Sequence, residues 1–266
     1  MDLITTNISK KHKFAVTDYY ELLHGDSSKL LKKIPEGSVD MIFADPPYFL
    51  SNGGISCSSG KMVSVNKAKW DESKSLKEKH KFNIQWLKEC KRILKKDGTV
   101  WISGTFHNIY SIGMALEELE FRILNNISWY KPNASPNLSC RFYTHSTETI
   151  IWASKSKKAK HTFNYQIIKE RNGNKQKRDV WEIPVTPKSE KAHGKHPTQK
   201  PFKLLEEIVL ASTNEGDIIL DPFNGSGTTG IAALTWNRKY IGIDSEADYL
   251  ELTQKRFSDI HPTFDI

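Results

Sequence analysis

Short apolar runs alternate with amphipathic helical patterns along most of the chain. The apolar runs predict strands over 20–24, 39–43, 98–103, 121–129, 148–153, 217–220 and 239–243. The helical patterns between them predict helices over 82–94, 109–119, 201–212, 226–235 and 247–257. This alternation is typical of an α/β fold built on a doubly wound, mostly parallel sheet.

Two polar stretches interrupt the alternation. Residues 51–81 are rich in Gly, Ser and Lys, and residues 155–196 show little periodicity. Loops this long inside a compact domain are usually lids or inserted binding elements. We therefore expect a single domain over 1–266, in which 51–81 forms a loop or lid and the second stretch belongs to an insertion.

The composition excludes several classes of protein. Hydrophobic residues make up 38% of the 266 residues and charged residues 26%, which matches neither a disordered chain nor a fibrous repeat. No run approaches the roughly 18 apolar residues of a membrane helix, and residues 1–13 lack the apolar segment of a secretory signal. The 3 cysteines, Cys57, Cys90 and Cys140, form no CxxC pair. We expect a cytoplasmic protein with no membrane association, no disulfide framework and no metal site.

The positive charge is concentrated in one segment. The whole chain has a net charge of +8, and residues 155–200 contain 13 Lys or Arg against 4 Asp or Glu. The rest of the chain is close to neutral, so the surplus is localised as a phosphate-contacting surface requires. We expect DNA contacts from Lys175, Lys177 and Arg178, with a solvated lysine-rich surface as the alternative.

A glycine-rich loop follows the predicted strand over 217–220. It reads DPFNGSGTTG from Asp221 to Gly230 and leads into a predicted helix. Glycines allow the backbone to approach a ligand, and Asp244 ends the next strand, where it can accept hydrogen bonds from a ribose diol. The pattern indicates an adenosine-containing cofactor. At this point a nicotinamide dehydrogenase and a simple strand-to-helix turn remain alternatives.

The acidic residue before the glycines separates these alternatives. Asp221 ends the predicted strand, and its charge would repel a pyrophosphate but suits a cationic methyl donor. Together with Pro222 and Phe223 it resembles the nucleotide-binding motif of S-adenosylmethionine-dependent amino-methyltransferases. The resemblance implies a site for S-adenosylmethionine that contains Asp221, Phe223, Gly225, Ser226, Gly227, Thr228 and Asp244.

The tetrapeptide DPPY, Asp45 to Tyr48, follows the predicted strand over 39–43. An exocyclic amine of a nucleobase is a poor nucleophile because its lone pair is delocalised into the ring. Two acceptors, the Asp45 carboxylate and the Pro46 carbonyl fixed by the rigid Pro-Pro backbone, favour a pyramidal nitrogen aimed at the methyl group. We expect Tyr48 to stack on the base. A turn with a half-buried tyrosine is the structural alternative.

The order of the two motifs resembles that of the beta-type DNA amino-methyltransferases, in which the catalytic motif precedes the cofactor motif. The segment HGDS resembles the one that approaches the cofactor adenine, which implies roles for Asp26 and Ser27. The segment HPTQKP resembles the one whose Thr198 and Lys200 reach the methionine carboxylate. The family also implies a Rossmann-like methyltransferase fold and an inserted target-recognition region, here over 131–196.

Within that family, ADPPYFLSNGGIS is most similar to the second adenine methyltransferases of DpnII-like, GATC-specific restriction-modification systems. The resemblance implies methylation of adenine N6 within GATC, on double-stranded or single-stranded DNA. It also implies a companion restriction endonuclease, a second methyltransferase and the homodimers common among relatives. Phe49 stands where many relatives carry Asn, so details of their adenine pocket do not transfer.

Other activities remain as alternatives to adenine methylation. N4-cytosine methylation is the nearest, since the same two acceptors serve either amine, although cytosine-specific relatives more often carry Ser in place of Asp45. A non-catalytic DNA-binding protein on the same fold is a second alternative, but every polar residue expected of the enzyme is present. Protein glutamine methyltransferases resemble an NPPY pattern with the opposite motif order.

Overall fold

The structure is a computed structural model of the chain, and it describes residues 3–49, 55–58, 61–64, 75–194 and 196–260. Within these ranges a 9-stranded sheet has the order β1-β2-β11-β10-β3-β6-β8-β7-β9. Its strands are β1 (Lys13–Val16), β2 (Tyr20–His24), β3 (Val39–Ala44), β6 (Leu94–Gly104), β7 (Arg122–Tyr130), β8 (Thr147–Ser154), β9 (Val180–Glu182), β10 (Ile218–Asp221) and β11 (Lys239–Asp244). A separate antiparallel hairpin pairs β4 (Ile55–Ser58) with β5 (Lys61–Ser64).

The central strands run parallel, as the alternation predicts. β2, β11, β10, β3 and β6 are parallel neighbours, whereas β8 runs antiparallel between β6 and β7. β9 runs parallel to β7 at the end of the sheet. The strands β2, β3, β6, β7, β9, β10 and β11 therefore all end at one side of the sheet, which we call the carboxyl edge. Open α/β sheets bind their ligands at this edge.

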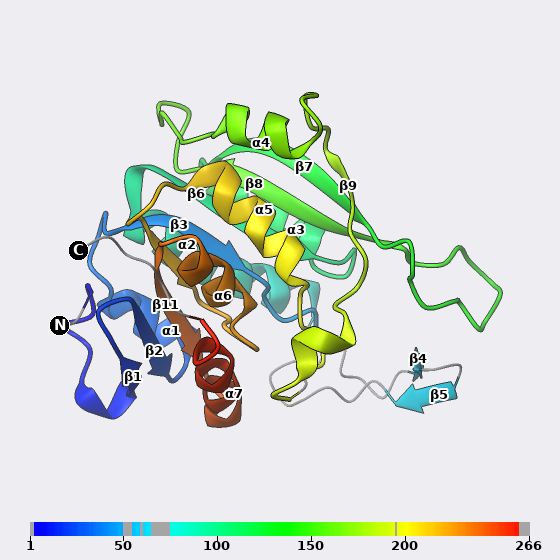
Figure 1. The fold of residues 1–266 in the computed structure, drawn as a ribbon, viewed down its shortest axis with the longest axis horizontal. Helices are drawn as coiled ribbons and strands as arrows, with labels where there is room; N and C mark the ends of the chain where they lie inside the picture. The colour runs from blue at the N-terminus through cyan, green and yellow to red at the C-terminus, as the bar shows by residue number, and fades with distance from the viewer. Residues whose placement is uncertain (1–2, 50–54, 59–60, 65–74, 195, 261–266) are drawn as a thin grey trace.

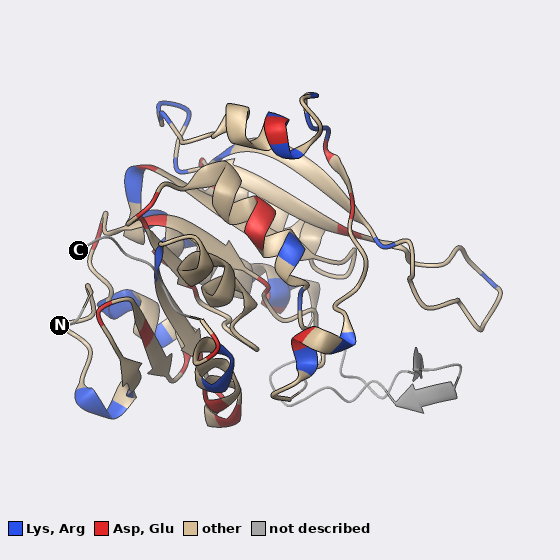
Figure 2. Cartoon of the chain, viewed as in Figure 1, with Lys and Arg blue, Asp and Glu red and all other residues tan. Residues whose placement is uncertain are grey.

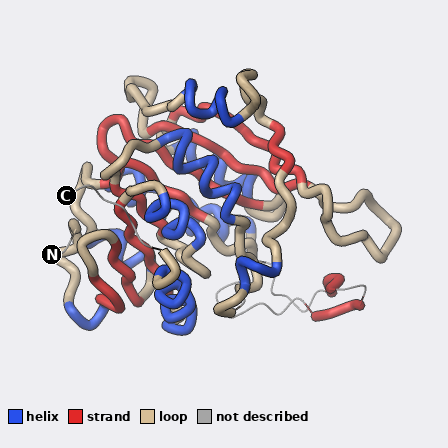
Figure 3. The backbone as a smooth tube through the Cα atoms, viewed as in Figure 1, coloured by secondary structure: helices blue, strands red, loops and turns tan. Residues whose placement is uncertain are grey.

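Helices cover both faces of the sheet (Figures 1 and 3). One face carries α1 (Ser27–Leu30), α2 (Leu76–Ile93) and α3 (Ile109–Glu118). The other carries α4 (Tyr165–Arg171), α5 (Phe202–Ser212), α6 (Thr228–Thr235) and α7 (Ala247–Phe257). Two hydrophobic cores result, the first between the sheet and α1–α3 and the second between the sheet and α4–α7. Successive side chains of a strand point to opposite faces, so Ile42 packs in the first core while Met41 and Phe43 pack in the second.

Helix α2 begins at Leu76, earlier than the predicted residue 82, because a capping box precedes it. The Ser75 backbone N–H donates to the Glu78 carboxylate at 2.9 Å, and the Glu78 N–H donates to Ser75 Oγ at 3.3 Å. The expected loop or lid over 51–81 therefore ends at this cap. Residues 51–54, 59–60 and 65–74 of that expected lid lie outside the described residues.

The sequence pattern does not predict β1, α4 or β9. β9 has only 3 residues, and it exists because Trp181 pairs with Trp129 of β7, a contact between distant parts of the sequence. α4 shows little periodicity because Ile168 is the one buried residue of its 7. Short elements held by tertiary contacts leave a weak signal in a single sequence.

The predicted insertion over 131–196 occupies both edges of the sheet. The loop over 131–146 joins β7 to β8 and projects from the carboxyl edge (Figure 1). The turn over 172–179 precedes β9 and therefore lies at the opposite edge. Figure 2 shows Lys and Arg gathered in this turn and sparse in the loop over 131–146. The basic residues of this turn and the carboxyl edge are thus on opposite sides of the sheet, whereas Lys188, Lys191 and Lys200 of the same basic segment follow β9 on the carboxyl side.

Two further features concern the described part of the chain. No helix there is long and apolar enough to cross a membrane. The same residues contain no group of three or more His, Cys, Asp or Glu side chains that could hold a metal ion. Cys90 is buried in the first core, and Cys140 is exposed.

Candidate active site

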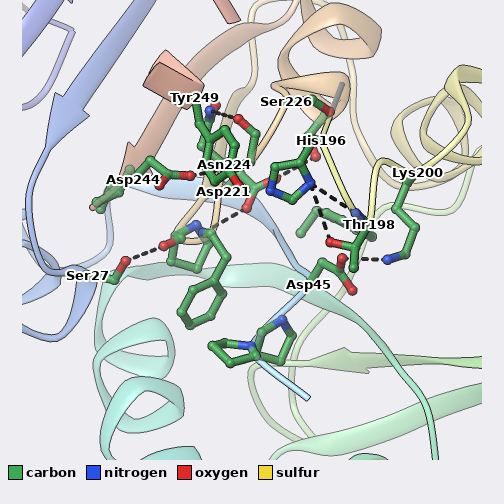
Figure 4. A pocket seen from close by; sticks show the side chains of 18 of the residues that line it. Ser27, Asp45, His196, Thr198, Lys200, Asp221, Asn224, Ser226, Asp244 and Tyr249 are labelled. Carbon is green, nitrogen blue, oxygen red and sulfur yellow. Dashed lines mark hydrogen bonds and ion pairs between the residues drawn. The ribbon is translucent and has the colours of Figure 1, made fainter. Parts of the chain in front are cut away.

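A cavity of about 330 Å³ opens at the carboxyl edge of the sheet (Figure 4). Its volume is within the usual range of small-molecule sites. Segments that are far apart in the sequence form its wall, around Ser27, Asp45, Lys200, Gly225 and Asp244. All the predicted catalytic and cofactor-binding residues line this cavity except Gly227, which packs against Thr253.

The DPPY motif places a carboxylate and a phenol side by side at the end of β3. Tyr48 Oη donates to Asp45 Oδ1 at 2.6 Å, and Lys200 Nζ donates to Asp45 Oδ2 at 2.5 Å. The Asn108 side-chain amide donates to the Pro47 carbonyl at 3.1 Å, and Phe49 turns the chain with a φ of 57°. The backbone of the motif is therefore held from both sides.

Burial and neighbouring charges set the protonation of this group. Burial raises the pKa of Asp45 above its ordinary value, while the adjacent Lys200 opposes that increase. Burial alone would lower the pKa of Lys200, but Asp45 and Glu148 raise it above the ordinary lysine value. The pKa of Tyr48 is raised well above 10.0 by burial and by the same carboxylates. Asp45 and Lys200 thus form a buried ion pair beside a neutral phenol.

Two residues of this site are absent from the sequence prediction. Glu148 lies at the start of β8, and its carboxylate is 3.5 Å from Tyr48 Oη and 3.7 Å from Lys200 Nζ. Lys131 follows β7 and contacts Glu148 at 3.0 Å. The signal that points to them is the pairing of β3, β6, β8 and β7, which no single motif reveals.

Asp221 ends β10 and is buried at the start of the glycine loop. Its Oδ2 accepts the hydroxyl of Thr229 at 2.6 Å, and its Oδ1 accepts the backbone N–H of Phe223 at 3.0 Å. Burial nevertheless raises the pKa of Asp221 to about 7. A cationic group in the cavity would be stabilised by the ionised form of this side chain.

The glycine loop is fixed by contacts that only glycine allows. Gly225 and Gly227 have φ values of 50° and 71°, which favour glycine. A Cβ on Gly227 would meet Thr253 Cγ2 at 2.4 Å. Asp244, at the end of β11, accepts the Gly225 N–H at 2.7 Å, and burial raises the pKa of Asp244 to about 6. This hydrogen bond holds the glycine loop against Asp244, the residue predicted to accept hydrogen bonds from the ribose.

Asp26 and Ser27, the predicted cofactor-binding residues at the start of α1, lie beside the glycine loop. Asp26 caps α1 by accepting the Ser28 N–H at 2.8 Å. Ser27 Oγ donates to the carbonyl of Pro222 (Figure 4). The start of α1 is therefore tied directly to the glycine loop, and both residues line the cavity.

The HPTQKP segment lies on the opposite wall. The Thr198 N–H donates to His196 Nδ1 at 3.3 Å, and Thr198 faces the cavity in Figure 4. Lys200 also faces the cavity, but its ammonium contacts Asp45. Lys200 thus links the predicted cofactor segment to the catalytic motif.

Buried hydrogen bonds from α7 support the remaining loop residues. The Arg256 guanidinium donates to the carbonyl of Ser226 and, at 3.1 Å, to Thr228 Oγ1. Ser226 and Thr228 both line the cavity and are buried. Arg256 was not predicted, since a lone arginine on an amphipathic helix gives no signal of its partner.

The three predicted DNA-contacting residues do not lie in the cavity. Lys175, Lys177 and Arg178 belong to the turn before β9, at the edge opposite the pocket. Lys177 Nζ forms an ion pair with Glu207 at 2.7 Å and lies 4.9 Å from the ring centre of Trp181. Their role in DNA binding stays a prediction.

Known proteins match the chain over most of its length. The family model of the N6/N4 methyltransferases, described as DNA methylase, matches residues 39–255. The chain is 61% identical over 236 residues to type II methyltransferase M2.DpnII of Streptococcus pneumoniae, covering 88% of each. It is 59% identical over 246 residues to type II methyltransferase M2.LlaDCHI of Lactococcus lactis subsp. cremoris, covering 90% of this chain and 91% of that protein. The crystal structure of the M1.HpyAVI-SAM complex matches with a TM-score of 0.69 and 30% identity, over 90% of this chain and 98% of that one.

Proposed function

The chain belongs to the DNA methylase family of N6 and N4 amino-methyltransferases, and we propose that it methylates the N6 amine of adenine in DNA with S-adenosylmethionine as donor. The matches confirm the predicted family and its α/β methyltransferase fold. The observation that carries the proposal is the single cavity lined by both the DPPY motif and the glycine loop. It joins an amine-binding group to a nucleoside-binding group.

The residues of the cavity fit S-adenosylmethionine. Asp221 and Asp244 are buried carboxyl groups whose oxygens can accept hydrogen bonds from an amino group and from ribose hydroxyls. Burial raises their pKa values to about 7 and about 6, and a cationic amino group bound beside them would favour their ionised forms. Thr198 and Lys200 suit a carboxylate, and Phe223 provides an apolar wall. Bound at these residues, S-adenosylmethionine supplies an electrophilic methyl group.

Asp45 and Pro46 orient the amine that receives the methyl group. Each can accept one N–H of the amine, which directs the nitrogen lone pair away from the ring plane. Both oxygens of Asp45 already accept one hydrogen bond, and each keeps a further lone pair. Because burial raises the pKa of Asp45, its carboxylate is a stronger acceptor for the proton that the methylated amine releases.

The buried position of this site determines how a base can reach it. Tyr48 is only 7% exposed, so an adenine stacked within a duplex cannot contact the motif. The target base must leave the helix, at a cost of a few kcal/mol that single-stranded DNA largely avoids. We propose that the protein accepts both forms of DNA and methylates single-stranded DNA at least as fast as double-stranded DNA.

The target sequence rests on similarity. Identity of 59% and 61% to M2.LlaDCHI and M2.DpnII supports the predicted GATC site and a restriction-modification context with a companion endonuclease and a second methyltransferase. The two-acceptor arrangement at Asp45 also accommodates the N4 amine of cytosine, which is the alternative target. The Asp residue at position 45 favours adenine.

The loop over 131–146 is the part of the predicted insertion that we propose contacts DNA beside the cavity. It projects from the carboxyl edge, where the DPPY motif also lies. Phe142 and Tyr143 are 60% and 95% exposed, and exposed aromatic rings stack readily on unpaired bases. Arg141 supplies a cation in the same loop.

The decisive experiment separates methyl transfer from cofactor binding. We expect the wild-type protein to produce N6-methyladenine in unmethylated DNA, identified by mass spectrometry of the digested nucleosides. Asp45→Asn keeps the volume and one acceptor but loses the charge, so we expect at least a hundredfold lower rate with S-adenosylmethionine binding reduced far less.

The matched control is Asp97→Asn at the opposite edge of the sheet. Asp97 is exposed and accepts the Lys160 N–H at 2.7 Å, a contact that an amide oxygen can keep. We expect wild-type activity from this variant. If the product is N4-methylcytosine, cytosine replaces adenine as the target. If neither form of DNA contains a methylated base after the reaction, the proposal is overturned.

A further inference from the structure

Four charged side chains, two acidic and two basic, form a connected cluster that begins in the wall of the cavity with Asp45 and Lys200 and continues behind it with Glu148 and Lys131. Lys200 contacts Asp45 at 2.5 Å and Glu148 at 3.7 Å, and Glu148 contacts Lys131 at 3.0 Å. We call these four residues the charge quartet. Their side chains are between 7% and 14% exposed, so solvent screens their charges weakly.

The members of the charge quartet come from four separate segments. Asp45 follows β3, Lys131 follows β7, Glu148 begins β8, and Lys200 belongs to the segment before α5. These segments converge because β3, β6, β8 and β7 are consecutive strands of the sheet. Because Asp45 and Glu148 are anions and Lys131 and Lys200 are cations, the quartet has no net charge.

The quartet faces the residues assigned to the cofactor. Asp45 and Lys200 line the same cavity as Asp221 and Asp244. The charge of Asp45 is also felt at Asp221, where it contributes to the raised pKa. In methyl transfer the sulfonium must also approach the amine held at Asp45, so a change of one unit charge in the quartet is expected to act on the sulfonium.

We propose that Glu148 and Lys131 are positioning residues that balance the charge around the Asp45–Lys200 pair and so allow a cationic methyl donor to bind beside a buried lysine. The inference rests on the proposed function. Without Glu148, the quartet would carry one excess positive charge and would oppose a sulfonium ligand. Without Lys131, it would carry one excess negative charge and would favour that ligand.

Glu148 also orients the catalytic motif. Its Oε2 lies 3.5 Å from both Tyr48 Oη and Ser103 Oγ, so the carboxylate contacts the phenol that donates to Asp45. Lys131 holds the other carboxylate oxygen. The substitution Glu148→Gln keeps the shape and the acceptor of this group while removing its charge, which makes it the informative variant.

The test compares two ligands that differ in charge at sulfur. S-adenosylmethionine is a sulfonium cation, whereas S-adenosylhomocysteine is the neutral thioether. We would measure the Kd of each by isothermal titration calorimetry, without DNA, at about 0.1 M salt. We expect Glu148→Gln to weaken the binding of S-adenosylmethionine on the order of tenfold relative to S-adenosylhomocysteine, the effect of one unit charge about 12 Å from the sulfonium at an effective dielectric constant of about 20.

Further variants distinguish charge from structure. Lys131→Met should shift the same ratio of Kd values in the opposite direction, and the double variant Glu148→Gln with Lys131→Met should return it toward the wild-type ratio. Glu36→Gln is the matched control, since Glu36 is exposed before β3, at the edge of the sheet opposite the pocket, and should leave the ratio unchanged. A purely structural role would weaken both ligands equally.

The outcomes separate this inference from the proposed function. If the wild-type protein binds S-adenosylmethionine and methylates DNA, but neither single variant changes the ratio, the inference is overturned and the proposed function stands. The inference is also overturned if Glu148→Gln and Lys131→Met shift the ratio of Kd values in the same direction. Failure of the wild-type protein to bind either ligand overturns the proposed function and the inference with it.

Discussion

At the residue scale, the buried carboxyl group of Asp221 couples stability to pH. Its pKa is raised to about 7 in the folded protein, from 3.8 for an unburied carboxyl group. Between these values the folded protein holds a proton that the unfolded chain releases, so the free energy of unfolding falls as the pH rises through this window. The penalty is fully present above pH 7 and absent below pH 4.

Asp221→Asn tests this coupling. We compare the free energy of unfolding of the wild-type protein with that of the variant. Their difference, wild type minus variant, should fall by on the order of 3 to 4 kcal/mol between pH 4 and pH 8, because only the wild-type side chain titrates. Urea unfolding of the cofactor-free proteins at stepped pH measures the difference. Parallel pH profiles for the two proteins would contradict the assignment.

Gly227 is a position of the glycine loop that has no room for a side chain. Its φ is 71°, and a Cβ would lie 2.4 Å from Thr253 Cγ2. We expect Gly227→Ala to lower the free energy of unfolding by about 2 kcal/mol or more, from overpacking added to backbone strain.

Gly173→Ala is the control for the backbone contribution. Gly173 has a φ of 66°, but a Cβ there would meet nothing within 4 Å. Its cost should therefore be about 1 kcal/mol, the backbone part alone. Equal losses in both variants, by urea unfolding, would show that the contact with Thr253 is unimportant.

At the scale of elements, prediction succeeded where a segment is buried on one or both faces. β3 and β10 are almost wholly buried, so their apolar runs are unambiguous. The beginning of α2 is exposed from Leu76 to Glu78, and its apolar periodicity starts only near Phe82. The Ser75 and Glu78 pair carries the information about that boundary, and a hydrophobic pattern alone does not contain it.

The capping box gives a prediction for α2. Ser75→Ala removes the acceptor for the Glu78 N–H, so we expect a loss of about 1 kcal/mol in unfolding free energy and faster amide exchange in the first turn. Ser9→Ala is the control, because Ser9 precedes the helical turn Lys10–His12 without a capping hydrogen bond. An equal effect of both substitutions would exclude the capping explanation.

At the scale of the whole molecule, the motifs predicted the site because their residues follow parallel strands. Asp45, Asp221 and Asp244 each lie at the carboxyl end of a strand, and β3, β10 and β11 are neighbours in the sheet. Glu148 and Lys131 lie at the junction of two antiparallel strands whose place beside β6 depends on the complete strand order. A single sequence does not specify that order.

The distribution of charge over the molecule gives a prediction about DNA binding. Replacing Lys175, Lys177 and Arg178 with alanine should reduce the slope of log Kd against log salt concentration by roughly 2 to 3, as expected for the loss of three phosphate contacts. Lys10 and Lys11, replaced together, provide a control at the other end of the sheet. An unchanged slope in the triple variant would remove the edge opposite the pocket from the DNA interface.

The continuity of the cavity has a consequence for inhibitor chemistry. Because the DPPY motif and the glycine loop line one space of about 330 Å³, no protein wall separates the two substrates that meet there. A bisubstrate compound, in which an adenine analogue is tethered through a short linker to the adenosyl amino acid, would occupy both halves at once. Tethering removes the entropic cost of the second binding event, so we expect such a compound to bind more tightly than either half alone.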